Sequence, residues 1–318
     1  MSQLKIPEYR VRLFLSVDLT GSTAFKAKNT SFDWLKEFQK FYASFLALYS
    51  ENYSFSCDDI DSMDNADAEN CPKLWKTIGD EILFVNRVHS ISHLSAYVSA
   101  FSKTLMEFAD KFLGEDLDTK GNGWIAAFPS PNCSIGIGGD STIDPIAGIN
   151  DLPSEQLEAD VDENPRKYDF LGKGIDGGFR ISKNSNIDTF TISPALAYLL
   201  SKAKTNPDVT KFTGRFRFHE PQPLKGVLDG KRYPIISLDT QRHQVEKELS
   251  QLETELLKRP HFADDAKLRT YLEAFITHHE IEMPSLKMSN GEPDQPPPEH
   301  YQHYAQQWKR EYDKKNSK

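Results

Sequence analysis

Hydrophobic and polar positions alternate over residues 11–18, near the start of the chain. The odd positions from 11 to 17 carry Val, Leu, Leu and Val, whereas the even positions between them carry Arg, Phe and Ser. This two-residue period is typical of a β-strand. Small residues follow at 20–23, and apolar residues then recur at helical spacing over 32–49. The pattern predicts a strand, a Gly/Ser turn and a helix.

Alternating strand and helix patterns continue to about residue 240. Two apolar runs, 74–78 and 82–85, flank Gly79 and Asp80 and predict a hairpin. We further expect helices over 92–113, 175–183 and 194–202, strands over 124–128, 134–137 and 189–192, and a closing hairpin over 216–238. The acidic stretches 54–71 and 138–165 are typical of surface insertions. The alternation predicts an α+β fold, with helices packed on a mixed sheet.

The character of the chain changes after Thr240. Residues 243–257 are charged and helical in pattern, and their apolar residues have a/d-like spacing, at Val245, Leu249, Leu252 and Leu256. A second helical pattern covers 268–281, and the proline-rich stretch 289–298 is typical of an extended linker. We therefore expect a main domain at 1–240 and a helical accessory region at 241–318, which either packs against the main domain or regulates it.

Composition and charge narrow the classes of function. The chain has 318 residues and a formal net charge of -9, which argues against a nucleic-acid surface but is compatible with a single nucleotide whose phosphates are neutralised locally. Three cysteines without paired spacing suggest neither a disulfide framework nor a zinc site. No segment has the roughly 20 apolar residues of a membrane span, and we expect a soluble, cytoplasmic protein.

Two aspartates, Asp18 and Asp80, each follow an apolar strand at the start of a tight turn. Two carboxylates at neighbouring strand ends can hold a pair of divalent cations against a triphosphate. The alternative is that Asp18 caps the following helix and Asp80 is an ordinary turn residue. Gly21, Ser22 and Thr23 can offer N–H groups to a phosphate at the helix start, or can simply form the turn.

The order of three motifs resembles class III nucleotide cyclases. They are Phe14–Thr23, Lys76–Asp80, and Asp169–Lys173 continuing to Arg180, and the resemblance extends over roughly residues 10–240. Within that class, Ala127–Asn132, and Asp169–Gly172 running into Gly178–Lys183, look like the pyrimidine cyclases of the bacterial Pycsar antiphage system. The resemblance implies the cyclase-type fold: a mixed, mostly antiparallel sheet flanked by helices, here with a C-terminal helical extension.

The resemblance also implies the assembly and the metal ligands. It implies a homodimer with active sites between subunits, and a cyclic pyrimidine product that activates a separate effector during phage infection. Asp18, Asp80 and the backbone carbonyl of Leu19 would bind two Mn²⁺ or Mg²⁺ ions. These hard cations prefer oxygen ligands, so the chemistry of the residues agrees with the implied role.

Lys76 and Asp169 match the pair that recognises the base in adenylyl cyclases. The two-residue period predicts that Lys76 lies on the same strand and face as Asp80. Lysine only donates and ionised aspartate only accepts, so the pair reads one acceptor and one donor, which does not assign the nucleotide. The alternative is a surface salt bridge. Trp75 and Tyr49 either fill the base pocket or belong to the core.

Arg180 matches the arginine that stabilises charge on the reacting phosphate, a role that suits its fork of donors. Asp176 stands where most cyclases have an asparagine that orients the ribose. It can accept from a 2′-hydroxyl, and it can also pair with Arg180 one helical turn away. Lys225 and Lys231 either bind the terminal phosphates or are simply solvated.

The sequence therefore favours a nucleotide cyclase, a phosphorus–oxygen lyase that converts UTP into cyclic UMP and pyrophosphate. The preference for UTP over CTP rests on the family resemblance alone. The alternatives are a cytidylate cyclase making cyclic CMP, an adenylate cyclase, and a catalytically inactive nucleotide-binding signalling module.

Overall fold

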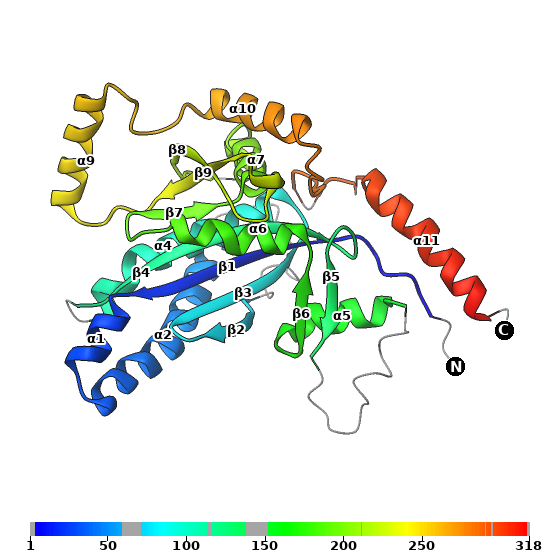
Figure 1. The fold of residues 1–318 in the computed structure, drawn as a ribbon, viewed down its shortest axis with the longest axis horizontal. Helices are drawn as coiled ribbons and strands as arrows, with labels where there is room; N and C mark the ends of the chain where they lie inside the picture. Colours follow the sequence, from blue (N-terminus) through cyan, green and yellow to red (C-terminus); the bar gives the residue numbers. More distant parts are fainter. Residues whose placement is uncertain are drawn as a thin grey trace.

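The computed structural model describes residues 4–58, 71–113, 116–137, 152–210, 212–289, 291–293 and 295–316. Within these residues the main sheet has seven strands in the order β2-β3-β1-β4-β7-β9-β8 (Figure 1). The strand bounds are β1 Arg10–Thr20, β2 Leu74–Ile78, β3 Glu81–Val88, β4 Asp118–Phe128, β7 Thr189–Ile192, β8 Phe216–Pro223 and β9 Arg232–Asp239. Only the β4–β7 pairing is parallel among these neighbours. The predicted α+β class is confirmed.

Helices flank this sheet and extend beyond it. Their bounds are α1 Ser22–Lys28, α2 Ser31–Asp58, α4 Ile91–Phe112, α5 Glu155–Glu163, α6 Lys173–Ile181, α7 Pro194–Ala203, α8 Pro207–Thr210, α9 Gln244–Leu257, α10 Asp265–His278 and α11 Glu299–Asn316. Short 3₁₀ turns lie at η1 Pro165–Lys167, η2 Ser182–Asn184 and η3 Leu228–Gly230. The elements β1-α2-β2-β3-α4-β4 form a split βαβ arrangement, which brings the end of β1 beside the β2–β3 turn.

Both faces of the central strand β1 are buried. Val11, Leu13, Leu15 and Val17 pack in a large core with α2 and α4, whereas Phe14 belongs to a second, aromatic-rich core on the opposite face. Figure 1 shows α6 crossing the sheet on this opposite side. Burial on both faces explains why β1 carries large side chains at its even positions as well.

The structure differs from the sequence prediction at both expected insertions and at one expected strand. The stretch 54–71 was expected to be an insertion, but α2 continues to Asp58, and 59–70 lie outside the described residues. The stretch 138–165 contains α5, whose helix has Ser154 as its N-cap and buries Val161. The expected strand at 134–137 is β5, Cys133–Gly136, but it pairs with β6, Tyr168–Leu171, in a separate two-stranded sheet. Local apolar patterns do not specify which strand pairs with which, so this small sheet was not predicted.

A buried ionic cluster joins α5 to β1. Arg12 and Glu158 are each 1% exposed at the side chain, with Nη1 and Oε2 2.7 Å apart. Arg12 also lies 2.6 Å from Asp162, whose second oxygen accepts from Arg10 Nε at 2.8 Å. The cluster explains how β1 accommodates two arginines in the interior, because each charge has a hydrogen-bonded partner.

The residues after 240 contact the main sheet and its helices. Leu268, Leu272 and Ile276 of α10 belong to the same core cluster as β1 and α4. In α11, the Trp308 Nε1 donates to the Pro153 carbonyl at 2.7 Å. The proline-rich stretch carries no helix or strand at its described positions before α11 begins. The division of the chain at residue 240 stays a prediction.

Candidate active site

Asp18 and Asp80 lie close together where β1 ends beside the β2–β3 turn. This place lies at the edge of the main sheet that the strand ends form, and not at an edge strand. Asp18 lies near the end of β1, opposite Glu81 of β3, and Asp80 lies in the β2–β3 turn just before Glu81. The Leu19 N–H donates to the Asp80 carbonyl at 3.2 Å. The N–H and C=O of one strand residue point to the same side, so the Leu19 carbonyl also lies on the side of Asp80. The structure thus places the backbone of Leu19, which follows Asp18, beside that of Asp80, and the binding of a metal by these residues stays a prediction.

Both aspartates have partners in the structure. The Lys120 ammonium lies 2.8 Å from Asp18 Oδ2, with side-chain exposures of 32% and 29% respectively. The Ser22 hydroxyl donates to Asp80. Ser22 is buried and its hydroxyl is engaged with Asp80, whereas Thr23 is exposed.

Glu81 is a third carboxyl group at this edge. Its pKa is raised, mainly by burial and also by the charges of Asp18 and Asp80, against opposing effects of a Ser16 hydrogen bond and Lys120. Sequence reasoning missed both Glu81 and Lys120. Glu81 was adjacent to a chosen residue, but Lys120 becomes visible only when the β1–β4 register sets it opposite Asp18.

The turn after β1 and the β2–β3 turn, which lie next to the two aspartates, are both tightly packed. Gly21 has φ of 86°, and a Cβ there would lie 2.4 Å from the Asp116 carbonyl oxygen, so only glycine fits this turn. The Tyr42 hydroxyl of α2 donates to the Gly79 carbonyl in the β2–β3 turn. Close contacts with the rest of the molecule therefore hold the turn that follows β1 and the β2–β3 turn that carries Asp80.

The donor set at this edge fits a hard divalent cation. Two carboxylates and one backbone carbonyl are oxygen ligands of the kind that Mg²⁺ and Mn²⁺ accept. No group of three or more His, Cys, Asp or Glu side chains suited to a metal occurs among the described residues. A cation here would rely on two side chains, the backbone and oxygens from elsewhere.

Lys76 and Asp169 form an ion pair between β2 and β6. Lys76 Nζ lies 2.8 Å from Asp169 Oδ1, and the two side chains are 30% and 34% exposed. The ammonium also lies 4.1 Å from the centre of the Trp75 ring, and Trp75 Nε1 donates to the Tyr168 carbonyl at 3.0 Å. The pair was expected from sequence; whether it reads a base stays a prediction.

The structure corrects the expected position of Lys76 relative to Asp80 and shows where Tyr49 and Trp75 lie. Asp80 lies in the turn beyond β2, which ends at Ile78, so the expectation that Lys76 and Asp80 share a strand was wrong. A β-bulge between Leu74 and Lys76 also interrupts the two-residue period. Tyr49 and Trp75 are buried in the two cores, which supports the core interpretation of both aromatic residues.

Asp176 and Arg180 project from one face of α6. Both are exposed, whereas Ile175, Gly178 and Ile181 are buried toward the sheet. Although they are one turn apart, no ion pair joins them in the described structure, so the pairing that their spacing allows is not formed. Neither makes a hydrogen bond or ion pair to Asp18 or Asp80 within the described part of the chain.

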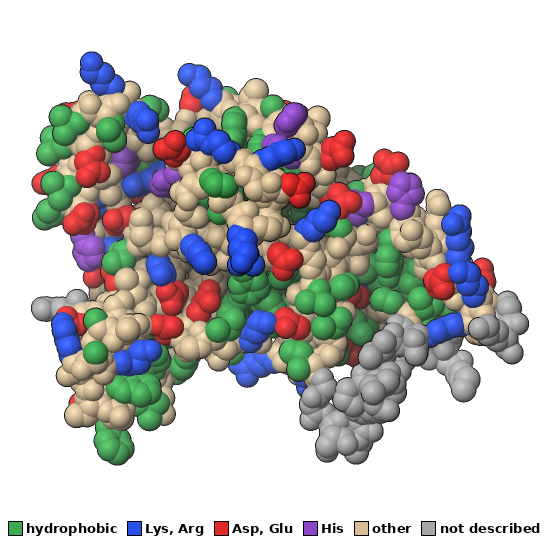
Figure 2. All heavy atoms as spheres, viewed as in Figure 1, with side chains coloured by type: hydrophobic (Ala, Val, Ile, Leu, Met, Phe, Trp, Pro, Cys, Tyr) green, Lys and Arg blue, Asp and Glu red, His purple; other side chains and the backbone are tan. Residues whose placement is uncertain are grey.

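Close packing holds α6 on the sheet. A Cβ at Gly178 would lie 2.2 Å from the Trp124 ring, and Asn122 Nδ2 donates to the Gly178 carbonyl at 3.1 Å. Figure 2 shows apolar side chains gathered below α6, around β5 and β6. The exposed apolar residues include Ile78, Ile135, Ile137 and Leu171.

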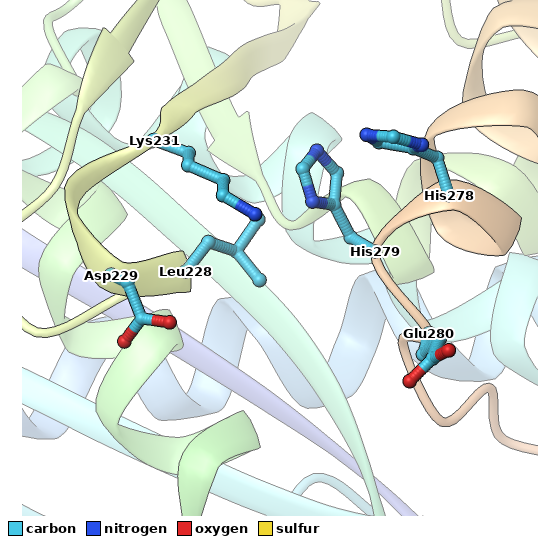
Figure 3. A pocket seen from close by; sticks show the side chains of 6 residues that line it. All are labelled: Leu228, Asp229, Lys231, His278, His279 and Glu280. Atoms are coloured by element: carbon cyan, nitrogen blue, oxygen red, sulfur yellow. The ribbon is translucent and has the colours of Figure 1, made fainter.

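The two predicted phosphate lysines lie at the β8–β9 hairpin. Lys225 is exposed in the turn after β8. Lys231 lines a pocket of about 210 Å³ between this hairpin and the end of α10, together with His278 and His279 (Figure 3). Burial lowers the pKa of His279, and the nearby His278 and Lys231 lower it further. No hydrogen bond or ion pair joins either lysine to Asp18 or Asp80 in the described residues.

No protein-family model and no curated protein matches the chain. Solved structures with a similar fold include the guanylate cyclase domain of RhGC from Catenaria anguillulae in complex with GTP, at 14% identity and a TM-score of 0.46, covering 74% of this chain and 100% of that one. The adenylyl cyclase CyaB from P. aeruginosa is 12% identical with a TM-score of 0.44, over 74% of this chain and 97% of that one.

A further similar structure is the dimeric guanylyl cyclase domain of the RhoGC fusion protein from the aquatic fungus Blastocladiella emersonii. It is 14% identical with a TM-score of 0.43, over 76% of this chain and 100% of that one. At these identities the likeness concerns the fold and not the substrate. Among the described residues, none of the helices combines the length and the hydropathy that a membrane-spanning helix needs.

Proposed function

We propose that this protein is a metal-dependent nucleotide cyclase that converts UTP into 3′,5′-cyclic UMP and pyrophosphate. The observation that carries the proposal is the proximity of Asp18 and Asp80. The residue after Asp18, Leu19, forms a backbone hydrogen bond with Asp80 where β1 ends beside the β2–β3 turn. The three cyclase-like motifs identified in the sequence supply most of the residues that such a reaction needs. A cyclic pyrimidine product would act on a separate effector in antiphage defence.

In this proposal Asp18, Asp80 and the Leu19 carbonyl hold two divalent cations, Mn²⁺ or Mg²⁺. When bound, these ions neutralise the triphosphate and favour ionisation of the ribose 3′-hydroxyl. The protein itself has to align that hydroxyl with the α-phosphate and to stabilise charge, because phosphoryl transfer requires no protein nucleophile. Gly21, Ser22 and Thr23 border the phosphates, and Lys225 is the candidate for the terminal phosphates.

Lys76 and Asp169 are the proposed readers of the base. The lysine donates to a ring acceptor and the carboxylate accepts from an amine or ring N–H. Cytosine and adenine present such an edge directly, and uracil presents it after a small shift of the base. The choice of uracil therefore rests on sequence resemblance, and cyclic CMP and cyclic AMP are the alternative products.

Arg180 and Asp176 are proposed to act across a homodimer. Their exposure on α6, without a hydrogen bond or ion pair to Asp18 or Asp80 among the described residues of one chain, supports a site completed by a second copy. Exposed Ile135, Ile137 and Leu171 provide apolar surface nearby for such an interface. Arg180 would stabilise the charge that develops on the α-phosphate, and Asp176 would accept from the ribose 2′-hydroxyl.

The decisive experiment is to incubate the purified chain with each ribonucleoside triphosphate and Mn²⁺, and to identify products by chromatography. A cyclic pyrimidine that is absent with Asp18→Ala would support the proposal and distinguish uracil from cytosine. Cyclic AMP would keep the chemistry and contradict the antiphage assignment. The absence of product from all four triphosphates would favour the inactive nucleotide-binding module.

A mixing experiment tests the shared site. Asp18→Ala and Arg180→Ala should each be inactive alone, since each homodimer then lacks one component in both sites. Random mixing should restore about one quarter of the wild-type activity, because half of the dimers then carry one intact site. The lack of any restoration would place the whole site within one chain.

Unchanged turnover with Asp176→Asn would show that the carboxylate charge at that position is unnecessary.

A further inference from the structure

Helix α9 exposes its apolar side chains to solvent. The exposed fractions are 65% for Val245, 49% for Leu249, 56% for Leu252 and 83% for Leu256, and no residue of the helix is buried. Figure 1 shows α9 at the periphery, linked to the body by extended segments at both ends, and Figure 2 shows apolar side chains along its outer edge. A helix with such a stripe normally turns it toward a core.

The spacing of these four residues is that of a coiled-coil seam. They follow each other at intervals of four, three and four residues, which gives a/d positions over two heptads. The polar side of the helix instead contacts the chain, because the Ser250 and Thr254 hydroxyls lie 3.4 Å and 3.1 Å from His261 Nδ1. The seam therefore points away from the segment on which the helix rests.

Glutamates border the seam on both sides. Glu246 and Glu253 occupy the positions on one side of it, and Glu248 and Glu255 occupy those on the other. Two copies of α9 packed together would oppose glutamate to glutamate, in the parallel and the antiparallel orientation alike. Like charges at these positions oppose association, whereas Lys or Arg on the other helix would pair with all four.

We infer that α9 is a docking surface for a partner protein that presents an amphipathic helix, with an apolar seam bordered by Lys or Arg. The apolar residues of the two helices interdigitate, and the basic side chains of the partner pair with the four glutamates of α9. The glutamates exclude a second copy of this chain as the occupant. This inference does not depend on the proposed cyclase activity.

The test uses the full chain and two labelled synthetic peptides of about three heptads, both with Leu at the a and d positions. One peptide carries Lys at every e and g position, and the other carries Glu. Fluorescence anisotropy should show the basic peptide binding at least about tenfold more tightly than the acidic one, with the preference shrinking at high salt. Equal binding of the two peptides, or no binding of the basic one, overturns the inference.

Variants locate the binding surface. Leu252→Asp should weaken binding of the basic peptide by about tenfold or more, whereas Gln251→Asp adds the same charge beside the seam and should leave binding within about twofold. Changing the four glutamates to lysine should reverse the preference toward the acidic peptide. Circular dichroism checks that each variant keeps the helical content of the parent.

Sedimentation velocity distinguishes a partner from a second copy. The oligomeric state of Leu252→Asp should equal that of the parent chain at every concentration. If the substitution dissociates an oligomer of the parent, then the seam is occupied by a second copy, and the inference is wrong. Triphosphate turnover should be the same in Leu252→Asp and the parent, so failure of the cyclase proposal does not affect this test.

Discussion

Lys120 lies directly opposite Asp18 across the β1–β4 pairing, and its ammonium is 2.8 Å from the Asp18 carboxylate. A cation bound at Asp18 would share that carboxylate with the lysine. The aspartate is thus not an isolated acid at the end of a strand but one member of a charge pair whose partner comes from another strand. The register of the sheet, rather than the local motif, determines the electrostatic environment of the candidate metal ligand.

Replacing Lys120 with methionine should strengthen Mn²⁺ binding at this edge. The ammonium competes with the metal for Asp18, and a partly exposed pair of this kind contributes about 0.2–1 kcal/mol, equivalent to about 1.5- to 5-fold in affinity. Isothermal titration calorimetry with Mn²⁺ would measure the change. Lys28→Met removes the same charge from an exposed pair with Asp116 and should have no effect. Weaker Mn²⁺ binding in Lys120→Met would contradict the competition.

Lys76→Ala should reduce kcat/KM for the nucleotide by about 10- to 100-fold, because a hydrogen bond from a charged donor contributes about 1.5–3 kcal/mol. The midpoint of thermal unfolding should change little, since the pair with Asp169 is partly exposed. As a control, Lys111→Ala removes an ion pair of similar length, 2.9 Å to Glu107, on the surface of a helix. It should change neither kcat/KM nor the midpoint of thermal unfolding. A loss of stability with unaltered kinetics would identify the Lys76 pair as a purely structural salt bridge.

Gly178→Ala should destabilise the fold by about 1–3 kcal/mol, because the added methyl group overlaps the Trp124 ring and forces α6 away from β4. Gly177→Ala is the matched control on the same helix. A Cβ at Gly177 meets no atom within 4 Å, so alanine there should be neutral or stabilising by up to about 1 kcal/mol. Urea unfolding of both variants would measure the difference. Equal stabilities would mean that α6 does not pack closely at Gly178.

The stability of the fold should decrease below about pH 6.5 through His93. Burial, with a smaller effect of His89, lowers the pKa of His93 to about 3, and its Nε2 lies 2.9 Å from the Tyr53 hydroxyl. The unfolded chain therefore binds a proton that the folded chain excludes, and the free energy of unfolding falls by up to about 1.4 kcal/mol per pH unit as the pH decreases.

Comparing urea unfolding of the parent chain and His93→Gln between neutral and mildly acidic pH would measure this contribution. The variant should be less stable at neutral pH and should depend less steeply on pH. His303→Gln serves as the control, because His303 is 65% exposed at the side chain. A slope that His93→Gln leaves unaltered would assign the pH dependence to other groups.

Much of the fold could be predicted because periodicity is local information. The β2–β3 hairpin, α4, α6, β7 and α7 all lie close to their predicted ranges. The pairing of β5 with β6 and the ionic contacts of Arg12 with α5 depend on residues more than 30 positions apart, which no local pattern records. The helical part of 138–165 was also missed, because its charged residues looked solvated although Glu158 is buried.

The residues of the candidate site could likewise be predicted only in part. The junction of Asp18 with Asp80 and the pairing of Lys76 with Asp169 could be anticipated, since motif order and spacing indicate which residues belong together. Lys120 could not, because its proximity to Asp18 is a consequence of strand register, whereas Glu81 had one signal in the sequence, its adjacency to Asp80. The positions of Asp176 and Arg180 on one helix face could be assigned from sequence, but the exposure of that face is visible only in the fold.

The two-stranded β5–β6 sheet has a consequence for how substrate preference can change. Asp169 sits on this small sheet, whose ladder is separate from that of the seven-stranded sheet bearing Asp18. A shift of β6 by a fraction of a residue would move the proposed base-reading carboxylate without breaking a ladder hydrogen bond beside the metal ligands. The carboxylate of the Lys76–Asp169 pair can thus be repositioned apart from the ladder that holds Asp18, whereas Lys76 stays on β2 of the seven-stranded sheet.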